Sequence, residues 1–135
     1  MSIAQHLLAY GLTLVAFLGI DAVWLGVIAK NLYKDNLGHL MAAKPSLLPA
    51  AVFYLMYVAG IMILAVYPAV DKGSLGKAVV LGAIFGAIAY ATYDLTNAAT
   101  LKDWPLKITL LDILWGSVLT ATIAGIGYQI VNWIS

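Results

Sequence analysis

The sequence contains no cysteine, no arginine and no glutamate. Without cysteine the chain has no disulfides, thiolate metal sites, iron–sulfur clusters or cysteine nucleophiles. Cysteine usage therefore does not indicate whether the protein lies in an oxidising or a reducing compartment. Without arginine it lacks the guanidinium group that recognises phosphates with two hydrogen bonds, which argues against binding to nucleic acid. A net charge of +1 gives no further indication of an anionic partner.

Cofactor motifs are missing as well. The two histidines, His6 and His39, lie outside the apolar stretches and far apart in the sequence, so they supply neither a pair of haem ligands nor a zinc site. No glycine-rich nucleotide-binding pattern and no nucleophile elbow occurs. We therefore expect no metal and no cofactor.

What the sequence does contain is apolar residues, which make up 64% of its 135 positions, against 10% charged residues. This leaves too little polar surface for a soluble core and predicts an integral membrane protein. Four runs approach or exceed the ~20 residues that cross a bilayer as a helix. These runs are Leu7–Ala29, Leu47–Val70, Lys77–Asn97 and Ile108–Val131. We expect an all-α bundle of four transmembrane helices forming a single domain over residues 1–135.

The connections between the runs predict the topology. Residues 30–46 form either a short interfacial helix or a polar loop, and the other two connections are short. Four crossings place the first and third connections, which carry five lysines, on one side and both termini, with two lysines, on the other. By the positive-inside rule the side with five lysines is cytoplasmic and both termini are outside.

Three aspartates interrupt the apolar runs. Asp21, Asp94 and Asp112 each lie five to nine residues from a lysine at the cytoplasmic end of their run, roughly 8 to 13 Å along a helix. A charge in hydrocarbon costs ~2.5 to 3.5 kcal/mol on insertion scales. Three carboxyl groups at one depth are therefore expected to be paired with a partner, to be protonated, or to have a function. The three aspartates therefore predict one shared site.

Helical spacing adds polar and aromatic residues to that site. Tyr90, Asp94 and Asn97 share one face of the third run, while Trp24 and Trp115 each follow an aspartate by three residues. The tyrosines of the second run reach the same depth and can donate hydrogen bonds to carboxylates. The candidate binding residues are Asp21, Trp24, Tyr54, Tyr57, Tyr90, Tyr93, Asp94, Asn97, Asp112 and Trp115. Trp104 and Trp133, near the ends of runs, are interpreted as interfacial anchors.

Three interpretations of the aspartates remain open. The first is a binding or proton-handling site for a small polar, cationic or lipid ligand. The second is an auxiliary or structural subunit, in which the carboxyl groups only hold helices together, and the chain works in a homo-oligomer or a larger membrane complex. The third is a lipid-modifying membrane enzyme with an aspartate as general base.

The motif Tyr90-Ala-Thr-Tyr-Asp-Leu-Thr-Asn97, followed by Asp112-Ile-Leu-Trp-Gly116 and preceded by Asp21-Ala-Val-Trp24, resembles a bacterial family of predicted membrane proteins, domain of unknown function 2177. The resemblance spans nearly the whole chain. It implies a small four-helix protein of the bacterial inner membrane, with both termini in the periplasm on the lysine argument above. The family has no assigned activity and so implies no catalytic residue.

Overall fold

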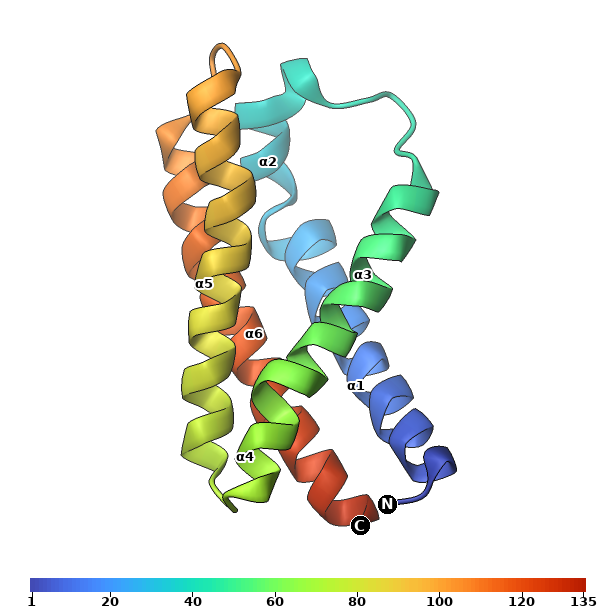
Figure 1. Cartoon of the computed structure of the whole chain (residues 1–135). Coiled ribbons are helices and arrows are strands. Elements are labelled where there is room, and N and C mark those ends of the chain that lie inside the picture. Colours follow the sequence, from blue (N-terminus) through green and yellow to red (C-terminus); the bar gives the residue numbers. More distant parts are fainter.

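The computed structural model describes all 135 residues and consists of helices joined by short connections (Figure 1). Four helical segments are long and apolar enough to cross a membrane, which confirms the predicted all-α class and the four spans. The first combines α1 (Ile3–Val23) with a π-helical turn, η1 (Trp24–Ile28), and the second combines α3 (Leu47–Ile61), a second π-helical turn η3 (Met62–Val66) and α4 (Tyr67–Asp71). The third and fourth are α5 (Leu75–Thr100) and α6 (Leu106–Ile134).

Local sequence explains where several helices begin. Ser2 caps α1 with a capping box, because its hydroxyl accepts from the Gln5 amide and its own amide donates to the Gln5 side chain. Ser74 caps α5 with a single bond, in which its hydroxyl accepts from the Lys77 amide at 3.0 Å. Pro105 precedes the first residue of α6, where no amide hydrogen is needed.

Residues 30–46 contain a helix, one of the two alternatives that the sequence left open. α2 (Lys30–Leu37) continues into a short 3-10 turn, η2 (Gly38–Leu40), and an extended segment then leads to α3. α2 and the α5–α6 connection lie at one end of the molecule, whereas both termini and the α4–α5 turn lie at the other (Figure 1). The five-lysine connections therefore share one end of the bundle, as the count of four spans requires.

α5 and α6 pack closely because glycine replaces larger residues where they meet. A Cβ atom at Gly82 would lie 2.7 Å from the Cβ of Ala124 and from the carbonyl oxygen of Thr120. A Cβ atom at Gly86 would overlap the carbonyl oxygen of Gly116 and the side chain of Thr120. Small residues of this kind allow the close backbone approach on which helix association in membranes depends. These glycines fix α5 against α6.

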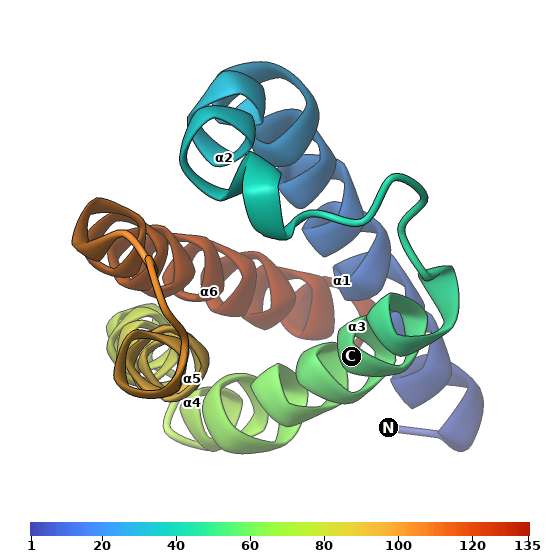
Figure 2. The ribbon, with the colours of Figure 1, turned by 90° about the horizontal axis from the view of Figure 1, so that it is seen from above.

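α3 diverges from α5 toward the end that carries α2 (Figures 1 and 2). The second span meets α5 mainly through η3 and α4, at the opposite end. Consistent with this, the first buried residue of α3 is Tyr57, and the three residues of α3 before Ala50 are exposed. The bundle is closed at the end with the termini and open at the end with α2.

We predict that Gly86→Ala destabilises the protein, because the added methyl group has no space between α5 and the backbone of α6. Overpacking of this kind costs about 1 to 3 kcal/mol. Thermal unfolding in detergent measures the effect. Gly19→Ala is the matched control, since nothing lies within 4 Å of a Cβ atom at this helical glycine. Equal stability of the two variants would contradict the close α5–α6 contact.

Candidate functional site

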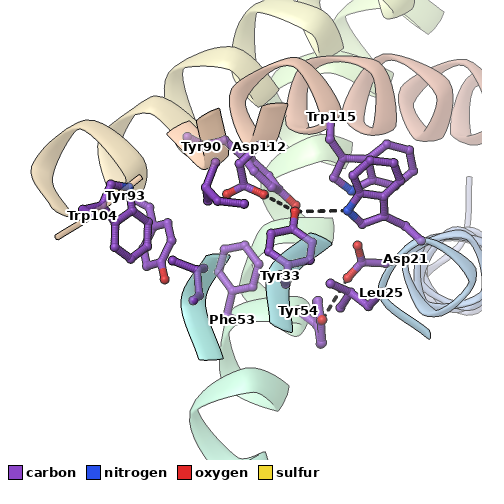
Figure 3. A pocket seen from close by; sticks show the side chains of 14 residues that line it. Asp21, Leu25, Tyr33, Phe53, Tyr54, Tyr90, Tyr93, Trp104, Asp112 and Trp115 are labelled. Atoms are coloured by element: carbon purple, nitrogen blue, oxygen red, sulfur yellow. Dashed lines mark hydrogen bonds between the residues drawn. The ribbon is translucent and has the colours of Figure 1, made fainter. Parts of the chain in front are cut away.

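A cavity of about 550 Å³ lies in the half of the bundle that carries α2. α1 and η1, α2, α3, α5 and α6 all contribute to its wall (Figure 3). Its lining residues are Asp21, Trp24, Leu25, Tyr33, Leu37, Phe53, Tyr54, Ala89, Tyr90, Tyr93, Trp104, Ile108, Asp112 and Trp115. Small-molecule sites have about this size and are mostly apolar, with a few polar groups that orient the ligand.

Tyr33 connects three elements of the wall through its hydroxyl group. This hydroxyl donates to Oδ1 of Asp112 on α6 at 2.6 Å and accepts from the indole Nε1 of Trp24 at 3.1 Å (Figure 3). Asp112 is half-buried. α2 is thereby attached to η1 and to α6 by side-chain hydrogen bonds at the top of the cavity.

Burial and the neighbouring Asp112 carboxylate raise the pKa of Tyr33 above its ordinary value. Burial disfavours the charged phenolate, and the carboxylate disfavours it further. Tyr33 therefore stays protonated throughout the physiological pH range and remains a donor to Asp112.

Asp21 forms a second polar position in the same cavity. The Tyr54 hydroxyl donates to its Oδ2 atom at 2.9 Å (Figure 3), and the aspartate itself is buried. The indole N–H of Trp115 approaches this carboxyl group, but it is buried without a partner at hydrogen-bonding geometry. A buried donor without a partner is rare in folded proteins, so the Asp21 region has unused hydrogen-bonding capacity.

Asp94 does not line the cavity, although the neighbouring Asp112 does. It is completely buried, and neither of its carboxyl oxygens has a hydrogen-bond partner. Two ionised carboxylates offer acceptors only, so neighbouring carboxyl groups can form a hydrogen bond only when one of them carries a proton. Asp94 is therefore a second buried carboxyl group near the cavity with unused hydrogen-bonding capacity.

Aromatic rings cover much of the remaining wall. The indoles of Trp24 and Trp115 stack with centroids 4.2 Å apart and an interplanar angle of 9°. The Tyr90 ring lies directly over Gly116, in space that any side chain at this glycine would occupy. No lysine, arginine or histidine lines the cavity. The protein thus supplies carboxyl groups and aromatic rings there without a compensating positive charge.

Metal binding has no support in the arrangement of side chains. No group of three or more histidine, cysteine, aspartate or glutamate side chains is placed to hold a metal ion. The residues around the cavity offer hydrogen-bond acceptors, hydroxyl donors and aromatic faces instead.

Seven of the ten candidate residues from the sequence line this cavity. They are Asp21, Trp24, Tyr54, Tyr90, Tyr93, Asp112 and Trp115. Three others do not: Asp94 is completely buried, Tyr57 is buried in the core and shares a 2.6 Å hydrogen bond with Thr120, and Asn97 is absent from the lining. The hydroxyl group of Tyr57 already has its hydrogen-bond partner on α6. The position of a residue along its span predicts its depth in the membrane but does not reveal such a partner.

Sequence reasoning missed the contribution of α2. Tyr33 and Leu37 both line the cavity and lie four residues apart, on one face of this helix. That spacing is visible in the sequence, but it is equally typical of a helix lying on a membrane surface. Trp104, interpreted as an interfacial anchor, also lines the cavity, and its indole N–H donates to Thr109 at 3.0 Å.

Comparison with protein families gives a match over residues 6–129 to a family model described as "Predicted membrane protein (DUF2177)". The chain belongs to this family. The match covers the second and third spans of the DUF2177 chain completely, most of the first and fourth, and every residue of the cavity wall. Searches of curated proteins and of solved structures gave no match.

We predict that Tyr33→Phe loosens α2, because the phenyl ring keeps the packing but loses both hydrogen bonds. A hydrogen bond to a charged group contributes about 1.5 to 3 kcal/mol. Amide hydrogen exchange over residues 30–40 should become faster by the corresponding factor. Tyr128→Phe is the control, since this tyrosine lies in α6 and makes no side-chain hydrogen bond. Unchanged exchange in α2 would show that the Tyr33 hydroxyl does not hold this helix.

Proposed function

We propose that this protein binds a small polar or cationic ligand in the cavity, between Asp21 and Asp112, and that the neighbouring Asp94 and Asp112 exchange a proton when the ligand binds. The observation that carries the proposal is the pair of carboxyl groups on the cavity wall with no positively charged residue among the lining. A charge in a membrane interior is costly unless something pairs with it. A ligand that supplies positive charge or hydrogen-bond donors would provide that partner.

A purely structural role explains the cavity less well. Carboxyl groups that only join helices are expected to be enclosed by donors from neighbouring helices. Here Asp112 is half-buried and faces open space, and the Trp115 donor has no partner. Both features are expected of a site whose remaining contacts come from a ligand.

We predict that Asp112→Asn and Asp21→Asn each weaken binding of benzyltrimethylammonium at least tenfold, because each removes one of the charges that faces the cation. The probe has a fixed positive charge, and binding to purified protein in phosphatidylcholine nanodiscs can be measured by calorimetry. Asp71→Asn is the control, since Asp71 is exposed at the opposite end of the bundle. Saturable binding with the same affinity in wild type and in both cavity variants would overturn the proposal, and so would the absence of any binding.

The same titration tests the proton exchange. If the incoming cation displaces a proton from Asp94 or Asp112, affinity rises with pH by up to about tenfold per unit over the range in which that proton is lost. The amide of Asp94→Asn cannot gain or lose a proton as a carboxyl group does. The affinity of this variant should therefore change less with pH than that of the wild type. An equal pH dependence in wild type and Asp94→Asn would show that Asp94 takes no part in proton exchange on ligand binding.

We also propose that the protein lies in the bacterial inner membrane with both termini in the periplasm. The support is the distribution of lysines, five at the α2 end and two at the other. A cavity in the α2 half would then lie in the cytoplasmic leaflet.

We predict that a membrane-impermeant maleimide added to spheroplasts labels Lys72→Cys and not Asp35→Cys. Both positions are exposed, and the natural chain has no cysteine that would give background. Labelling after lysis, when both positions should react, is the control for reactivity. The reverse pattern in intact spheroplasts would invert the orientation.

A further inference from the structure

Two aromatic residues of the cavity wall, one on α3 and one on α5, are partly exposed at the surface of the bundle. Phe53 on α3 and Tyr93 on α5 both line the cavity, yet 44% and 58% of their surfaces remain exposed. Both residues lie inside predicted membrane spans, six residues after the start of α3 and seven before the end of α5. Along a helix this is roughly 9 to 11 Å from the end of the span. The exposed rim at this point therefore faces hydrocarbon and not water.

The path of α3 accounts for this exposure. Its first three residues are exposed, and this end of the helix diverges from α5 (Figures 1 and 2). α2, held by Tyr33 to Asp112, lies across the end of the bundle, and its Leu37 side chain contributes an apolar surface to the cavity. The wall on the lipid side is thus aromatic and incomplete.

Polar groups are concentrated away from that rim. Asp21 is 6% exposed, and its bond to Tyr54 lies within the bundle. Asp112 is bonded to Tyr33 beside the stacked Trp24–Trp115 pair (Figure 3). A molecule in the cavity would have its polar end against the carboxyl groups and its apolar end toward the bilayer.

We infer that the ligand is a membrane-dissolved amphiphile with a positively charged amine or quaternary ammonium head and an alkyl chain, which enters sideways between α3 and α5. This inference rests on the proposed function and adds the ligand class and the route. The head would lie between the two carboxyl groups and near indole and phenol rings, which attract cations through their π-electron faces. The chain would leave past Phe53 and Tyr93 into the surrounding lipid.

The charges of the wall argue against an anionic head. Neither lysine nor arginine lines the cavity, and the only ionisable groups of low ordinary pKa there are carboxyl groups. A phosphate or sulfate would meet like charge without a compensating donor of positive charge.

Binding of a homologous series tests the inference. The probes are hexyl-, octyl- and decyltrimethylammonium, with decyl sulfate as the anionic counterpart and benzyltrimethylammonium as the water-soluble cation, all in phosphatidylcholine nanodiscs. Burial of each additional methylene should raise the apparent affinity about fourfold. Asp112→Asn should weaken binding of every cation by a similar factor, and decyl sulfate should not bind saturably.

The outcomes separate this inference from the proposed function. If binding of the cations depends on Asp112 but their affinity is independent of chain length, the ligand is not an amphiphile, and the proposed cation-binding site is retained. If decyl sulfate binds as tightly as the decyl cation, the cationic head is wrong. If no probe binds, both the inference and the proposed function fail.

The lateral route has its own test, which uses the cysteine-free background. In the variant Phe53→Cys/Tyr93→Cys, a flexible bis-maleimide joins the two sides of the rim. Bridging should slow association of decyltrimethylammonium at least tenfold and leave association of benzyltrimethylammonium unchanged. The same reagent on either single variant should leave association of both cations unchanged. Unchanged association of the decyl cation after bridging would overturn lateral entry.

Discussion

The structure depends on one constraint, that a carboxyl group within a membrane span must find its partners inside the protein. Asp112 finds one in the Tyr33 hydroxyl, which donates to it at 2.6 Å. This bond draws α2 back over the bundle, although α2 is too short and too polar to span a membrane. Trp24 adds its indole N–H to the same hydroxyl and ties the end of the first span to this arrangement. Without Asp112, α2 would lose its hydrogen bond to α6 and keep only the bond from Trp24.

The close α5–α6 contact and the divergence of α3 then give the cavity its shape. Gly86 and Gly116 let α5 and α6 approach until the Tyr90 ring covers Gly116, which makes this pair a rigid wall. α3 is held by its far end and leaves α5 before reaching the level of the aspartates. π-helical turns are frequent at functional sites, and η1 carries Trp24 into the cavity at such a turn. The carboxyl groups thus lie in a space that is polar inside and apolar toward lipid.

Sequence alone predicted the four spans, because runs of about 20 apolar residues have few other uses in a protein of this composition. It also predicted that Asp21 and Asp112 share a depth, since helical rise converts residue number into height. It did not reveal which residues at that depth face one another. Tyr57 has the depth of the site but bonds Thr120, because rotation and tilt of α3 depend on packing partners. Tyr33 was missed because its role depends on α2 folding back, and the pattern of that helix fits a membrane surface equally well.

The most direct test of the central claim is a double-mutant cycle between Tyr33→Phe and Asp112→Asn, with unfolding free energies measured in one detergent. Residues joined by a hydrogen bond show coupling of about 0.5 to 3 kcal/mol, whereas distant sites are additive within about 0.3 to 0.5 kcal/mol. We predict coupling in the upper part of that range, because the loss of either partner should make the loss of the other much less costly. Additive effects of the two substitutions would contradict it, because Asp112 would then not hold α2 in place.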